Sequence, residues 1–200
     1  MKIELFADYR SPYSYLTNFR LRRAKVDFSV KLIDAVEVMI AVKNQPSPAC
    51  PPKARYAAMD AARSAARAGV PYFPNRPLLA AVMGDAFPGS AMLRAGLAAQ
   101  KLGVFSQVND GLFRAFWAGE DSLVTSAGKQ TFLDSLEINA PTLWDEAALA
   151  WTTDELHKNN SEAIQKGVFG VPTTFCEGEM FFGNDRLGLV FERLQIEEVI

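Results

Sequence analysis

The sequence has few of the residues on which metal, redox and nucleic-acid chemistry depend. Its 200 residues include 2 cysteines, which do not form a C-x-x-C pair, and 1 histidine, too few for a histidine-based zinc site. A net charge of −2 gives no basic surface for nucleic acid. No apolar run approaches the roughly 18 residues needed to cross a bilayer, and no secretory signal is visible. We expect a cytoplasmic protein with no metal site, no nucleic-acid partner and no membrane partner.

The two cysteines lie in unlike settings, far apart in the sequence. Cys50 falls in a proline-rich loop, and Cys176 falls in an apolar run typical of a strand. A disulfide between them is not expected in a cytosolic protein, and the simplest role for Cys176 is that of a small buried residue. The single histidine, His157, stands among polar neighbours on a predicted helix, so we expect it at the surface.

The opening segment is predicted to form a strand, a turn and a helix. Ile3, Leu5 and Phe6 make an apolar run of strand length that stops at Asp8. Ser11 suits the N-cap, because its hydroxyl can accept from the first turn and the proline after it has no N–H to lose. A serine there also lies at the positive end of the helix dipole, where it could donate to a bound thiolate. The segment alone leaves both roles open.

After the opening strand, the sequence pattern changes from alternating helix and strand to helices alone, and then returns to strands near the end. After the opening strand come a helix over 13–24, a strand over 28–32, helices over 36–42, 53–68, 78–83, 90–102, 104–117, 125–136 and 152–166, strands over 168–176 and 179–182, and a terminal helix. This order, β-α-β … α-β-β-α, predicts an α/β thioredoxin fold interrupted by an all-helical insertion. We place the thioredoxin-like domain at residues 1–35 and 152–200 and the helical insertion domain at 36–151.

Four aromatic residues of the insertion have two possible roles. Phe73, Phe87, Phe113 and Trp117 could line a substrate pocket, although aromatic residues at such spacing usually belong to a core.

Two motifs connect the halves of the predicted thioredoxin fold. In proteins with this fold the active site lies where the first helix begins and faces a cis-proline before the third strand; here these are Ser11-Pro12-Tyr13-Ser14 and Val171-Pro172-Thr173. The insertion and the Gly-Val-Phe-Gly-Val-Pro run from Gly167 resemble the DsbA-like branch. Redox members of that branch carry Cys-Pro-x-Cys, whereas this chain has serine at both cysteine positions, so it cannot exchange a dithiol there.

With a serine at this place, the chain resembles the kappa-class glutathione transferases and the closely similar 2-hydroxychromene-2-carboxylate isomerases. The resemblance extends through the chain and includes Asn44 before the proline loop, Lys53 after it, and Phe-Gly-Asn-Asp-Arg-Leu over residues 182–187. It implies glutathione as the cofactor, bound by Ser11, Lys53, Val171, Pro172, Asn184, Asp185 and Arg186, with Asn44 and Tyr13 in the substrate pocket.

The resemblance also implies what these residues do. Ser11 would keep the glutathione sulfur as a thiolate, Val171 would pair its backbone with the cysteinyl unit, and Asp185 would face the γ-glutamyl ammonium. Each residue also has a structural role that needs no ligand. Asp185 could be an N-cap, Lys53 and Asn44 exposed loop residues, Arg186 part of a surface ion pair, and Pro172 part of a simple turn.

The function implied is a glutathione-dependent isomerase. Its thiolate would add reversibly to an unsaturated aromatic 2-oxo acid, so the partners are glutathione and a small aromatic substrate, in a homodimer. A kappa-class-like transferase that conjugates electrophiles is the first alternative, because it needs the same binding half. The second alternative is a DsbA-like protein that holds peptides without redox chemistry.

Overall fold

The computed structural model describes residues 3–84 and 87–197, and the chain divides into two compact units. The first unit extends as far as Tyr72 and resumes at Asn159, and the second is Phe73–Lys158. Helix α9 (Ala150–Gln165) carries the chain from the second unit back into the first.

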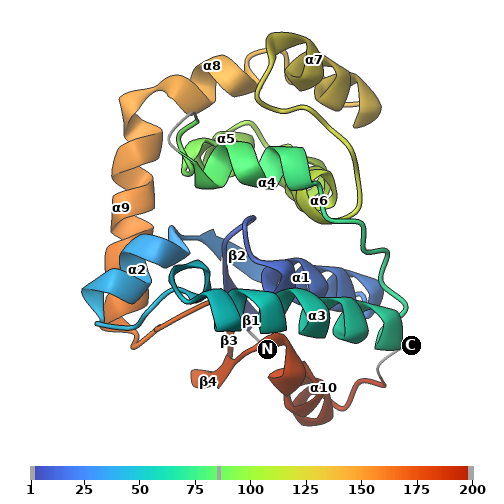
Figure 1. Cartoon of the computed structure of the whole chain (residues 1–200), viewed down its shortest axis with the longest axis vertical. Coiled ribbons are helices and arrows are strands. Elements are labelled where there is room, and N and C mark those ends of the chain that lie inside the picture. The colour runs from blue at the N-terminus through green and yellow to red at the C-terminus, as the bar shows by residue number, and fades with distance from the viewer. Residues whose placement is uncertain (1–2, 85–86, 198–200) are drawn as a thin grey trace. The chain divides into compact units, whose positions relative to one another are not determined.

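The first unit is built on a four-stranded mixed sheet (Figure 1). The strands stand in the order β2-β1-β3-β4 and are β1 (Ile3–Ala7), β2 (Ser29–Leu32), β3 (Thr173–Cys176) and β4 (Glu179–Phe182). Strand β1 is parallel to β2 and antiparallel to β3, and β3 is antiparallel to β4. All five residues of β1 are buried, as expected for a central strand covered on both faces. The strand order and the order of elements confirm the predicted α/β thioredoxin fold with inserted helices.

The helices of the first unit follow the predicted order. They are α1 (Pro12–Arg23), α2 (Ala35–Ala41), the short 3₁₀ turn η1 (Ser47–Ala49), α3 (Pro51–Arg67), the 3₁₀ turn η2 (Asn184–Arg186) and α10 (Leu187–Leu194). Helix α1 buries Tyr15, Leu16 and Leu21, whereas Phe19 is half-buried. Each fully buried leucine of this kind stabilises the fold by about 1.5–3 kcal/mol.

The core beneath β1 joins both halves of the chain. Phe6 of β1 packs there with Ile33 and Val38 from the early segment and with Val168 and Val171 from the late one. Phe175 of β3 meets the Phe6 ring edge-on, at 5.8 Å between ring centroids. The residues before β3 are therefore fixed by side chains more than a hundred positions earlier in the sequence.

The unit boundaries differ from those expected from the sequence. Residues 36–72, which the sequence analysis places in the helical insertion, cluster with the sheet unit. The physical reason is the packing of α3 alongside α1: the Tyr13 hydroxyl donates to Asp60 Oδ2 at 2.9 Å, and Arg23 donates to the Ala68 carbonyl at 2.7 Å. The sequence indicates α3 as a helix but not the contacts that join it to α1.

The second unit is helical in all the elements assigned to it. They are α4 (Arg76–Met83), α5 (Ala91–Lys101), α6 (Phe105–Trp117), α7 (Ser126–Ser135) and α8 (Leu143–Ala148). Thr125 caps α7, and its hydroxyl oxygen accepts from Gly128 N at 3.1 Å. The sequence pattern predicts that the next helix begins at residue 152, which is wrong: α9 already begins at Ala150, and the Thr152 hydroxyl donates back to the Leu149 carbonyl.

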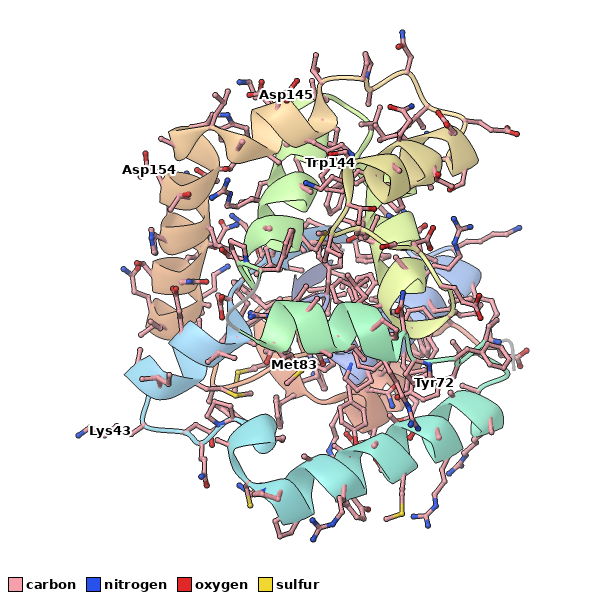
Figure 2. The ribbon with its side chains drawn as sticks, turned by 45° about the horizontal axis from the view of Figure 1, so that its top comes forward. Lys43, Tyr72, Met83, Trp144, Asp145 and Asp154 are labelled. Carbon is pink, nitrogen blue, oxygen red and sulfur yellow. The ribbon has the colours of Figure 1, made fainter. Side chains whose placement is uncertain are left out.

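Charged side chains extend outward from the helices and loops of both units. Lys43, Asp145 and Asp154 are exposed examples in Figure 2. Of the helices within 3–84 and 87–197, none combines the length and the apolar character required to cross a membrane.

Candidate active site

Ser11 lies where α1 begins, as the sequence predicts. Its amide donates to the Asp8 carbonyl at 3.0 Å, and its Oγ accepts from Ser14 N at 3.2 Å. The cap uses a lone pair of the oxygen and leaves the hydroxyl proton available to an acceptor outside the helix. Because Ser11 is half-buried at the positive end of the dipole, a thiolate could receive that proton in a hydrogen bond. Ser14, at the second cysteine position of redox relatives, is buried and turned toward Asp8 N.

The peptide bond between Val171 and Pro172 is cis, as the resemblance implies. Phe6 pairs with Thr173, so Pro172 lies beside the carboxyl end of β1, the same edge of the sheet from which the chain turns toward Ser11. Val171 is buried, yet its backbone N–H and C=O have no hydrogen-bond partner among the described residues. A backbone with unpaired groups at this place can accept an added strand.

The segment 184–186 is brought to the same edge by β4. Gly183 N donates to the Pro172 carbonyl at 2.9 Å, which joins the end of β4 to the cis-proline. Asn184 is buried, and its Oδ1 accepts from Arg20 at 2.9 Å, so only its Nδ2 group is left for a ligand. Asp185 is exposed and pairs with its neighbour Arg186 at 3.0 Å.

Neither Asn184 nor Asp185 is a side-chain cap. The predicted cap of the terminal helix is wrong, because residues 184–186 form the turn η2 and α10 begins at Leu187. Asp185 therefore keeps its carboxylate on the surface, where its pairing with Arg186 is weak and exchangeable.

Lys53 and Tyr13 are connected through α3. Lys53, Ala57 and Asp60 are spaced to share one face of the helix, and Tyr13 contacts the last two. Lys53 is exposed and makes no ion pair within the described residues. A cation in the first turn opposes the helix dipole, so helix stability does not explain this lysine. Burial, together with Asp60, raises the pKa of the Tyr13 phenol well above its ordinary value, so the phenol stays protonated at neutral pH.

Asn44 contacts the segment that precedes the cis-proline. Its Nδ2 donates to the Phe169 carbonyl at 2.7 Å, so this amide holds backbone two residues before Val171. The Phe169 ring in turn lies 4.4 Å from the ring of Phe182, and both rings are more than a third exposed. This exposed aromatic pair is absent from the sequence-based site, because nothing local in the sequence shows that residues 169 and 182 meet.

A buried ionic network immediately precedes Ser11. Arg10 Nη2 lies 2.6 Å from Asp8 Oδ2 and 2.8 Å from Asp34 Oδ1. Asp8 also accepts from Ala35 N at 3.0 Å, and Asp34 accepts from Val36 N at 3.0 Å. Arg10 thus joins the turn before α1 to the start of α2, and the position of Ser11 depends on this connection.

The remaining predicted residues separate into core and surface. Phe113 and Trp117 are buried in the second unit, whereas the Phe73 ring is 73% exposed and Phe87 is half-buried. His157 is exposed, as expected. Cys176 is buried, and that burial raises the pKa of its thiol, which confirms a small buried residue.

Together, the serine-capped helix, the cis-proline and the mixed sheet define a DsbA-like thioredoxin-fold protein without the redox cysteines. The family model described as a DSBA-like thioredoxin domain matches residues 2–195. A 2-hydroxychromene-2-carboxylate isomerase of Pseudomonas putida is 31% identical over 201 residues, covering 94% of this chain and 91% of the relative. Another of that name, from Pseudomonas sp. (strain C18), is 29% identical and covers 92% and 86%.

Solved structures agree with this fold. A solved structure of 2-hydroxychromene-2-carboxylate isomerase matches with a TM-score of 0.81 at 23% identity, and the match covers 98% of this chain and 95% of that one. The chain belongs to the DSBA-like thioredoxin family and, within it, groups with the 2-hydroxychromene-2-carboxylate isomerases.

Proposed function

We propose that this protein is a glutathione-dependent isomerase of the 2-hydroxychromene-2-carboxylate isomerase type, acting on an unsaturated aromatic 2-oxo acid. The names of its relatives support isomerase activity. The observation that carries the glutathione part is Ser11: its oxygen caps α1 while its proton remains free for a sulfur. With serine at both cysteine positions of the motif, the protein needs a thiol from a second molecule.

The groups at this edge of the sheet fit a tripeptide with two carboxylates and one ammonium. The unpaired backbone of Val171, ahead of cis-Pro172, suits the peptide unit of the cysteinyl residue. The exposed carboxylate of Asp185 suits the ammonium, and Asn184 Nδ2 suits a neighbouring carboxylate oxygen. Lys53, unpaired on α3, suits the other carboxylate.

When bound, glutathione would supply the nucleophilic sulfur, which adds reversibly to the substrate double bond and lets it rotate before the thiol is eliminated. The work of this chain is to hold that sulfur ionised. Ser11 donates a hydrogen bond to it, and the amides of the first turn of α1 add the positive end of the dipole. Arg186 stands beside Asp185 and limits the negative charge there. The Tyr13 phenol stays protonated, so it contributes to the shape of the pocket and does not act as a general base.

The test removes the hydroxyl donor of Ser11 in two variants that differ in how well they cap α1. Ser11→Ala costs the helix about 1 kcal/mol, and Ser11→Gly costs only a few tenths. Both should lower glutathione-supported kcat by about 10²–10³-fold, as loss of a charge-stabilising donor does, with little change in thermal stability for the glycine variant. Thiolate absorbance of the bound glutathione should fall in both variants.

Ser106→Ala, a change of an exposed serine on α6, is the matched control and should behave as wild type. Full turnover in either Ser11 variant, or equal turnover without glutathione, would contradict the proposal. Recovery of a stable conjugate in place of an isomer would identify a transferase.

A further inference from the structure

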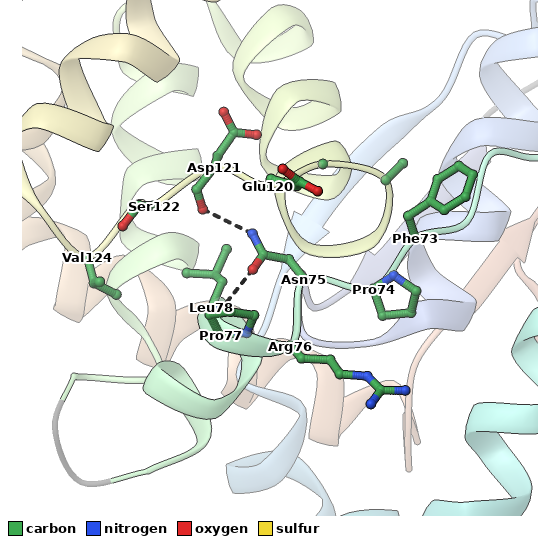
Figure 3. A pocket seen from close by; sticks show the side chains of 12 residues that line it. Phe73, Pro74, Asn75, Arg76, Pro77, Leu78, Glu120, Asp121, Ser122 and Val124 are labelled. Atoms are coloured by element: carbon green, nitrogen blue, oxygen red, sulfur yellow. Dashed lines mark hydrogen bonds between the residues drawn. The ribbon is translucent and has the colours of Figure 1, made fainter.

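A cavity of about 620 Å³ lies wholly within the second unit, between the start of α4 and the loop after α6 (Figure 3). It falls in the size range of small-molecule sites. Its apolar lining comes from Phe73, Pro74, Pro77, Leu78 and Val124.

The wall of this cavity is held by one buried asparagine. Asn75 Nδ2 donates to the Ala115 and Asp121 carbonyls, each at 3.0 Å, and its Oδ1 accepts from Leu78 N at 3.1 Å. The backbone adds a further connection, because Asn75 N donates to the Phe116 carbonyl at 2.9 Å. The cavity is therefore a fixed feature of the second unit.

Two side chains of the lining are left without partners. The Phe73 ring is 73% exposed, which is unusual for an aromatic side chain whose own backbone is anchored, here to the Trp117 carbonyl at 2.6 Å. Arg76 is exposed and has no hydrogen bond or ion pair among the described residues. In Figure 3 its guanidinium extends away from the carboxylates of Glu120 and Asp121.

We propose that this cavity binds aryl carboxylates, with the aromatic ring against Phe73 and Pro74 and the carboxylate on Arg76. Phe73 offers a ring face or edge to an aromatic ligand. The planar guanidinium of Arg76 matches a carboxylate and is weakly hydrated, so it loses little when it binds one. Glu120 and Asp121 also line the cavity and repel an anion, so the carboxylate of the ligand has to lie on the Arg76 side, away from both. The proposal needs no glutathione and stands apart from the proposed function.

The experiment is a calorimetric titration without glutathione, with trans-cinnamate and the neutral cinnamyl alcohol as probes. In the wild type, cinnamate should bind about tenfold more tightly than the alcohol, the lower end of the effect of a charge-assisted hydrogen bond. In Arg76→Gln this preference should vanish. In Phe73→Ala both probes should weaken by a similar factor, since the ring contact is common to them.

Three control variants locate the site. Arg67→Gln removes an exposed arginine from α3, Met83→Ala removes an exposed apolar side chain from the far end of α4, and Lys53→Gln removes the lysine proposed to bind glutathione. All three should bind cinnamate as the wild type does. Equal affinity for the two probes in the wild type, a preference that survives in Arg76→Gln, or a loss of cinnamate binding in Lys53→Gln would overturn the proposal.

Discussion

Replacing Arg10 by methionine should strongly destabilise the first unit while leaving its apolar core intact. Methionine keeps most of the side-chain volume but removes both ion pairs, those to Asp8 at 2.6 Å and to Asp34 at 2.8 Å. The two carboxylate side chains are only 2% and 9% exposed, so water cannot replace the lost guanidinium. Breaking a buried pair of this kind costs about 3–5 kcal/mol.

Remaining backbone donors place the expected loss at the lower end of that range. Asp8 keeps Ala35 N, and Asp34 keeps Val36 N and Glu37 N. We expect a loss of about 3 kcal/mol, which for a chain of this length lowers Tm by about 6–12 °C. Burial opposes the charge of Arg10, but Asp8 and Asp34 outweigh it and raise the guanidinium pKa above its ordinary value.

The direction of that pKa shift also predicts how the stability loss of Arg10→Met depends on pH. A raised folded pKa contributes stability at every pH below the unfolded value, so the deficit of Arg10→Met should be constant from about pH 6 to pH 10. Thermal unfolding followed by far-UV circular dichroism measures it. Arg186→Met, which breaks an exposed pair, is the control and should cost at most about 0.5 kcal/mol. A loss below 1 kcal/mol in Arg10→Met, or one equal to the control, would refute the role given to this network.

Three further outcomes are expected. Tyr13→Phe should lower stability by about 1 kcal/mol, the loss of one partly buried hydrogen bond, and leave the pH profile of turnover unchanged. Lys166 and, to a smaller extent, Lys31 lower the pKa of Glu162. The ionised carboxylate therefore stabilises the fold above about pH 4.5, and this contribution is lost as the pH falls. Glu162→Gln should flatten the acid limb of a plot of stability against pH. Gly170→Ala places a Cβ 2.9 Å from an aromatic ring of β4 and should lower Tm, whereas Gly188→Ala, which meets nothing within 4 Å, should not.

Local chemistry explains which parts of the fold could be predicted. The apolar run at Ile3–Ala7 and the Ser11-Pro12 start of α1 are each determined by their own residues, and both are confirmed. The predicted site residues from Ser11, Val171–Pro172 and 184–186 meet at one edge because the strand order brings them there. What each does for glutathione stays a prediction.

Distant contacts explain what could not be predicted. Asn184 looks like a helix cap in the sequence, but Arg20, 164 positions away, binds its Oδ1 and carbonyl. The Arg10 network joins residues 8, 10 and 34, and Asn160 from the late segment binds Asp34 N at 2.9 Å. None of these partners is marked by a local pattern, since an arginine near a carboxylate in sequence is common on ordinary surfaces.

The sheet order has a consequence for how the chain acquires its structure during synthesis. Strand β1 is synthesised long before its antiparallel neighbour β3, so one of its two hydrogen-bonding edges stays unpaired until β3 has been made. The second unit is one continuous segment, Phe73–Lys158, so it does not depend on β3 and can fold before the sheet is complete. Truncations at the C-terminal side should therefore abolish the sheet and spare the helices made in between.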